Sequence, residues 1–105
     1  MIYGTQSTSR WFQPSPSLTR TIACEFAADG IRANALIPLA ASPSFTLWAE
    51  ENPEEYRVIN ETIPLRRMGD PEHDVGAVAV FLASDDARYV TGTTLLADGG
   101  RGYLR

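Results

Sequence analysis

The chain has 105 residues, enough for one small domain and too few for two. Apolar residues make up 44% and charged residues 21%, as in an ordinary folded domain, and the formal net charge of -4 argues against nucleic acid, whose phosphates bind basic surfaces. All nine Lys or Arg positions are arginines, so the chain contains no lysine.

Several further classes are excluded by what the sequence lacks. No apolar run approaches the ~20 residues of a membrane span, and no basic segment followed by an apolar one marks a secretion signal. We therefore expect a cytoplasmic protein with no membrane partner. Cys24 and His73 are the single cysteine and histidine, so we expect no metal site, a Cys24 packed as a small apolar residue, and a solvated His73.

The first helix is predicted to follow an irregular arm. Residues 1–16 contain Pro14 and Pro16, which disfavour helix, and residues 17–105 form the folded part. Ser17 is expected to cap a helix that ends at Asp29, with Gly30 supplying the left-handed residue after it.

A strand and a loop of small residues are expected next. Residues 31–37 (IRANALI) are largely apolar and stop at Pro38, which predicts a strand buried on both faces, as in parallel sheets. Residues 38–44 then leave the carboxyl end of that strand, the edge at which open α/β sheets bind ligands. The same small residues also suit a tight connection without a ligand.

Two short helical segments are expected after this loop. The first begins near Phe45, and the second is opened by Pro53, with Glu54 and Glu55 in its first turn. The pair either covers the loop as a lid or packs as surface helices.

The strongest pattern runs from Ile63 to Gly100. Asp70 can cap a helix whose first residue is Pro71. This helix has an apolar stripe made of Val75, Val78, Ala79, Phe81 and Leu82. A short apolar strand is predicted after it, made of Thr94, Leu95, Leu96 and Ala97.

The order strand, helical crossover, strand predicts a parallel pair, because such crossovers are right-handed. Two parallel strands make an incomplete sheet, since both faces and both edges need cover. The sequence therefore indicates the end of a larger sheet, with an open edge along residues 31–37.

These residues resemble the C-terminal part of short-chain dehydrogenases/reductases. The match runs over residues 18–100 and is carried by LTRTIACEFAADGIRANALIP, RMGDPE, FLASD, and YVTG followed by DGG. The resemblance implies an α/β fold, the C-terminal portion of a Rossmann-type doubly wound parallel sheet with two parallel strands and about four helices. It also implies oxidoreductase activity with NAD or NADP.

Two parts of the family's machinery are not found in the sequence. One is the glycine-rich turn that holds the pyrophosphate at a helix N-terminus. The other is the Tyr-x-x-x-Lys pair, whose lysine lowers the pKa of the tyrosine. Tyr3, in a stretch similar to the family's Tyr-Gly-Ala-Ser, is the candidate catalytic acid, although the usual spacing from Leu18 would place the tyrosine at Thr8.

The resemblance also implies binding residues. Pro38, Leu39, Ala41 and Ser42 match the loop that contacts the nicotinamide carboxamide, with Leu39 in place of the family's glycine. Phe45, Trp48 and Tyr56 belong to the substrate lid, residues 45–62, and residues 71–97 to a face used for dimer contacts.

Three functions are consistent with this inventory. The chain is an oxidoreductase-like protein that is inactive alone; or it is an interaction module that docks on itself or on a full-length family member; or a separate chain supplies the nucleotide-binding half. The expected partners are therefore a second copy or a full-length relative.

Overall fold

The computed structural model describes residues 16–104, and they divide into two compact units. Unit one combines residues 16–37 with residues 79–95, and unit two combines residues 38–78 with residues 96–104. In this part of the chain no helix is both long and apolar enough to cross a membrane.

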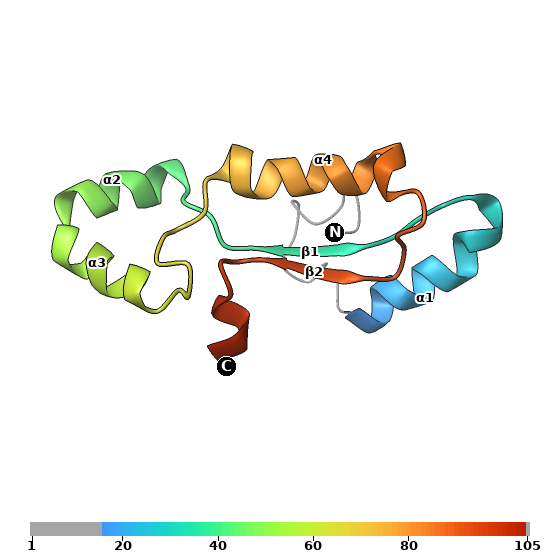
Figure 1. The fold of residues 1–105 in the computed structure, drawn as a ribbon, viewed down its shortest axis with the longest axis horizontal. Coiled ribbons are helices and arrows are strands. Elements are labelled where there is room, and N and C mark those ends of the chain that lie inside the picture. Colours follow the sequence, from blue (N-terminus) through green and yellow to red (C-terminus); the bar gives the residue numbers. More distant parts are fainter. Residues whose placement is uncertain (1–15, 105) are drawn as a thin grey trace. The chain divides into compact units, whose positions relative to one another are not determined.

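The sheet of the described residues has two strands, β1 (Ala35–Pro38) and β2 (Thr94–Ala97), which lie side by side (Figure 1). The Ala35 N–H donates to the Thr93 carbonyl (2.9 Å), and the Leu39 N–H donates to the Ala97 carbonyl (3.0 Å). Both bonds join residues at the same sequence offset, which is the register of a parallel pair. The predicted parallel pairing is confirmed.

The first strand is shorter and less buried than predicted. Residues 31–34 are not strand, because Asn34 replaces ladder bonds with its side chain: Oδ1 accepts from the Thr93 N–H and Nδ2 donates to the Val90 carbonyl, both at 3.1 Å. The predicted burial on both faces is also wrong. Ala35 is 1% exposed and Leu36 is half-buried, but Ile37, on the same face as Ala35, is 38% exposed.

The first helix of unit one, α1 (Pro16–Phe26), starts two residues earlier than a Ser17 cap predicts and continues into the short η2 (Ala27–Asp29). Pro16 occupies the first helical position, where a missing N–H costs nothing, so the prediction that Ser17 caps the helix is wrong. Gly30 has the expected left-handed backbone (φ 76°).

Cys24 is exposed, which corrects the prediction that it packs in the interior. The buried positions of α1 are Thr19 and Ala23, one helical turn apart. Cys24 follows Ala23 directly and so points about 100° away from that inward stripe.

Unit two contains the helical hairpin of α2 (Pro43–Glu51) and α3 (Pro53–Glu61), both labelled in Figure 1. Both helices begin with proline, as predicted for Pro53. The loop predicted over residues 38–44 is shorter, because Pro38 belongs to β1 and α2 already starts at Pro43.

The crossover helix begins where it was predicted, after Asp70, but in two forms. Residues Pro71–Gly76 (η3) make a π-helix, and α4 (Ala77–Ala83) continues as an α-helix, followed by η4 (Asp85–Ala87). Leu82 is buried, whereas Phe81, expected to extend the apolar stripe, is 44% exposed.

The C-terminal segment of unit two is organised by buried Asp98. Its carboxylate accepts the Gly100 N–H (3.0 Å) and the Gly102 N–H (2.8 Å), which closes the turn from β2 into η5 (Arg101–Leu104).

Candidate functional site

The loop after β1 is fixed by its backbone. Within unit two, the Ala41 N–H donates to the Gly69 carbonyl at 2.9 Å, and Ala40 forms a parallel bridge with Gly69. A side chain at Gly69 would bring its Cβ within 2.6 Å of the Leu39 carbonyl oxygen. Glycine at position 69 therefore permits the close approach that holds this loop.

Ser42 ends the loop and caps α2. Its Oγ accepts the Phe45 N–H (3.1 Å), and its carbonyl accepts the Thr46 N–H (2.9 Å) and hydroxyl (3.1 Å). Capping uses a lone pair of the serine oxygen, so the hydroxyl hydrogen remains able to donate to another acceptor. Ser42 is exposed, and a ligand carbonyl can reach this donor.

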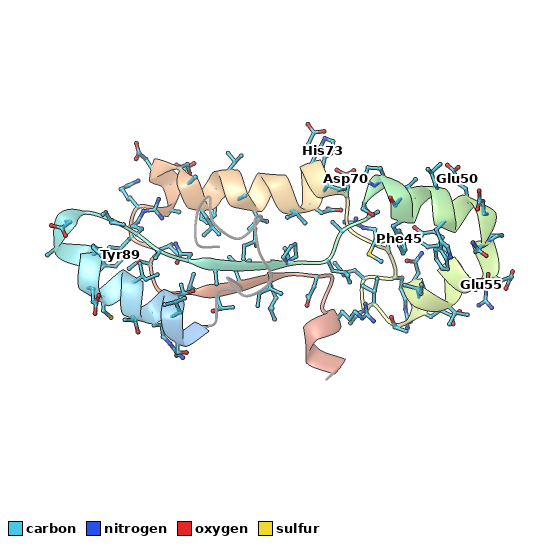
Figure 2. All side chains as sticks on the ribbon, turned by 180° about the vertical axis from the view of Figure 1, so that it is seen from behind. Phe45, Glu50, Glu55, Asp70, His73 and Tyr89 are labelled. Carbon is cyan, nitrogen blue, oxygen red and sulfur yellow. The ribbon has the colours of Figure 1, made fainter. Side chains whose placement is uncertain are left out.

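The three aromatic residues predicted for the lid form one cluster. The Phe45 ring lies 5.6 Å from that of Trp48 and 5.8 Å from that of Tyr56, the second pair in a T-shaped arrangement. Figure 2 places Phe45 between α2 and α3. Edge-to-face contacts of this kind stabilise the pairing of the two helices.

Two hollows adjoin this cluster, and Tyr56 lines both. The first has a volume of about 200 Å³, and the second about 290 Å³. The first is lined by Ala41, Phe45, Thr46, Ala49, Glu50 and Tyr56; the second by Pro53, Tyr56, Arg57, Asn60, Glu61 and Arg66. The sequence contained no motif for the second hollow.

Charged residues stabilise the turn before η3. Asp74 pairs with the Arg67 guanidinium through both carboxylate oxygens, and its Oδ2 accepts the Asp70 N–H (2.6 Å). The hydrogen bond from Arg67 holds the pKa of Asp74 well below its usual range and raises the pKa of Arg67.

Asp70 caps η3 and binds the neighbouring histidine. Its Oδ2 accepts the His73 N–H (2.7 Å) and lies 2.8 Å from His73 Nδ1; Figure 2 shows the two residues together. The backbone hydrogen bond, then the side-chain one, lower the pKa of Asp70. His73 is exposed, as predicted, and no group of three or more His, Cys, Asp or Glu in residues 16–104 is arranged to hold a metal ion.

The predicted site residues are partly brought together. Pro38, Leu39, Ala41 and Ser42 form one segment at the carboxyl end of β1, and it leads directly into the aromatic cluster. Tyr3 lies outside the described residues. The role of this segment in cofactor binding stays a prediction.

Parallel strands joined by a helical crossover, with a loop at the carboxyl end, define a Rossmann-type α/β protein. A family model described as Enoyl-(Acyl carrier protein) reductase matches residues 16–101. The chain belongs to the short-chain dehydrogenase/reductase family of oxidoreductases.

Several relatives are similar over most of this chain. It is 47% identical over 83 residues to 3beta-hydroxysteroid dehydrogenase 1 of Eggerthella lenta (79% of this chain, 31% of the relative) and 43% identical over 83 residues to galactitol 2-dehydrogenase (L-tagatose-forming) of Cereibacter sphaeroides (79% and 32%). The crystal structure of a short-chain dehydrogenase/reductase family oxidoreductase from Burkholderia thailandensis matches with a TM-score of 0.75 and 33% identity, covering 82% of this chain and 33% of that one. The chain thus spans about a third of the length of its relatives.

Proposed function

We propose that this chain supplies the substrate-side part of an NAD(P)-dependent oxidoreductase. In this proposal the loop Pro38–Ser42 faces the nicotinamide carboxamide, and the α2–α3 hairpin covers the substrate as a lid. The observation that carries it is the placement of Ser42: its position is fixed by capping, it ends the loop at the carboxyl end of β1, and its hydroxyl hydrogen is free to donate. A carboxamide oxygen is an acceptor suited to that donor.

Hydride transfer, we propose, requires a nucleotide-binding half in addition to these residues. The 105 residues contain no lysine to lower a tyrosine pKa and no glycine-rich turn for a pyrophosphate. That half can belong to a longer polypeptide or to a separate chain. The dehydrogenases among the relatives support a substrate that is an alcohol or its ketone.

Complementation tests this proposal. The purified chain is mixed with the nucleotide-binding fragment of a family member that ends where the similarity to this chain begins, and NAD(P)H oxidation is followed against a panel of ketones. We expect no turnover by either part alone and turnover by the mixture. Turnover by the 105-residue chain alone, abolished by Tyr3→Phe, would overturn the proposal.

Ser42 variants separate capping from ligand binding. Ser42→Thr keeps both the cap and the hydroxyl donor, Ser42→Asp keeps the cap but lacks the donor at neutral pH, and Ser42→Ala lacks both. In the complemented enzyme we expect nicotinamide binding to be retained by the threonine variant alone, whereas helix content measured by circular dichroism falls only in the alanine variant. Equal nicotinamide binding by all three would exclude Ser42 as a contact.

The second candidate function is an interaction module. It is favoured by β1, which has a strand neighbour on one side only among the described residues and exposes Ile37. Light scattering after size exclusion tests self-association, and co-purification tests a full-length partner. A stable monomer that retains no family member would rule the module out.

A further inference from the structure

Asp74 of unit two bonds to both ends of the short segment 67–70. Its carboxylate pairs with the Arg67 guanidinium through both oxygens, and Oδ2 also accepts the Asp70 N–H (2.6 Å). The Asp74 N–H donates in turn to the Asp70 carbonyl (2.9 Å), so the two aspartates exchange bonds as the partners of a capping box do. One side chain therefore holds the chain before Gly69 and after it.

The segment that Asp74 holds is the one to which the loop after β1 is bonded. The Gly69 carbonyl accepts the Ala41 N–H (2.9 Å), and Gly69 forms the parallel bridge with Ala40. A Cβ on Gly69 would lie 2.6 Å from the Leu39 carbonyl oxygen and 3.6 Å from the Asp74 Cβ. Gly69 thus adjoins both the loop and Asp74, so a shift of the segment is transmitted to the loop.

The two ends of the loop have different anchors. The Leu39 N–H donates to the Ala97 carbonyl of β2 (3.0 Å), whereas the Ala41 N–H donates to Gly69. Ser42 follows Ala41 directly in the chain. Release of the segment 67–70 should therefore loosen the end of the loop beside Ser42 and leave the end beside β2 in place.

The contact between Arg67 and Asp74 has a geometry that restricts motion. A guanidinium that binds both oxygens of a carboxylate is fixed in orientation, unlike the partners of most surface ion pairs. The Asp74 side chain is 30% exposed and also bonds the Asp70 backbone, whereas Glu54 is 79% exposed and makes a single side-chain contact with Arg57. Asp74 is therefore the better placed of the two carboxylates to hold a backbone segment.

We propose that Asp74 is a positioning residue: through Gly69 and Ala41 it places the Ser42 hydroxyl at the position of the nicotinamide carboxamide. The role of Ser42 comes from the proposed function, whereas the coupling of Asp74 to the loop does not depend on it. An Asp74 that served only to stabilise η3 would instead affect the opening of unit two as a whole.

Amide hydrogen exchange of the purified chain, without any cofactor, tests this coupling. The exchange rates of the Ala41 and Leu39 N–H groups are measured by NMR in wild type and in Asp74→Asn. We expect the ratio of the Ala41 rate to the Leu39 rate to rise about fivefold or more, because a local opening exposes only the bonds that it breaks. An unchanged ratio, whether both amides accelerate equally or neither does, would overturn the proposal.

Three further variants make the test specific. Arg67→Lys keeps the charge but loses the contact with both oxygens, so the ratio should rise less than in Asp74→Asn. If Asp74→Asn fails to fold, an unchanged ratio in Arg67→Lys would likewise overturn the proposal. Gly69→Ala acts directly on the contact with Leu39 and is the positive control. Glu72→Gln removes one carboxylate from the same turn and should leave the ratio unchanged; a rise as large as that in Asp74→Asn would contradict the assignment.

In the complemented enzyme, Asp74→Asn should act on cofactor binding. We expect the KM for NAD(P)H to rise about fivefold with a smaller change in kcat, because a contact with the carboxamide is made in the ground state and the transition state alike. Glu72→Gln should leave the KM unchanged. A raised exchange ratio with a wild-type KM would place the failure in the nicotinamide role of the loop, which belongs to the proposed function, and not in the coupling of Asp74 to the loop.

Discussion

Gly99 is the residue at which conformation and packing coincide. Its φ is 64°, and an added Cβ would lie 2.7 Å from Cγ2 of the fully buried Ile63. We expect Gly99→Ala to cost about 2–4 kcal/mol, from left-handed strain together with displacement of Ile63. Gly30→Ala is the matched control, because Gly30 has φ 76° with no atom within 4 Å, and strain alone predicts about 1 kcal/mol. Urea unfolding measures both, and equal losses would contradict the clash.

Asp74 makes stability depend on pH in the acid range. Because Arg67 lowers the folded-state pKa of Asp74 below the unfolded value of about 3.9, this stabilisation is complete above about pH 5 and is lost as the pH falls. We expect Asp74→Asn to be less stable than wild type at neutral pH and to show a flatter loss of stability below about pH 4. Thermal unfolding between neutral and acid pH measures this, with Glu72→Gln as the control for removing one charge from the same turn. Parallel pH profiles for Asp74→Asn and wild type would contradict it.

At the scale of elements, Asn34 joins the approach to β1 to the approach to β2. It is 5% exposed and bonds the Val90 carbonyl and the Thr93 N–H. Asn34→Ala should leave the Thr93 N–H without a partner and the Val90 carbonyl with the Arg32 guanidinium alone, and cost about 2–3 kcal/mol. Asn52→Ala, which removes one local bond to the Trp48 carbonyl, should cost about 1 kcal/mol. Chemical denaturation compares them, and similar losses would mean that Asn34 is not the link.

At the scale of the whole molecule, the open side of β1 determines what the chain can join. If a nucleotide-binding half adds alongside β1, the exposed Ile37 becomes covered, and Ile37→Lys should bury an unpaired charge. We expect this variant to weaken association with the complementing half about tenfold or more. Glu55→Lys, on α3, adds the same side chain elsewhere and should not. Equal association of the two variants, measured by sedimentation, would place the contact elsewhere.

Local chemistry made much of the fold predictable from the sequence. Three element boundaries were predicted from caps and turn residues that act within a few positions. They are the start of η3 at Asp70 and Pro71, the start of α3 at Pro53, and the end of η2 at Gly30. The strand Thr94–Ala97 was found in full, because turn residues bound a short apolar run on both sides. Phe45, Trp48 and Tyr56 lie on the two short helices predicted from the sequence, and their rings form one cluster there.

Contacts between residues distant in the sequence were decided by the tertiary structure. Asn34 shortened the first strand because its side chain reaches residues 90–93, and the exposure of Cys24 depends on which face of α1 packs inward. Turns that bring separate segments together also produce the pairing of Arg67 with Asp74. They likewise form the hollow lined by Asn60 and Arg66. By itself the sequence determined the element order and the parallel pairing, since these follow from local signals and periodicity, and its resemblance to known proteins indicated the family. Only the tertiary structure decided which polar groups are satisfied and which remain available to a ligand, because hydrogen-bond partners are set by distance in space.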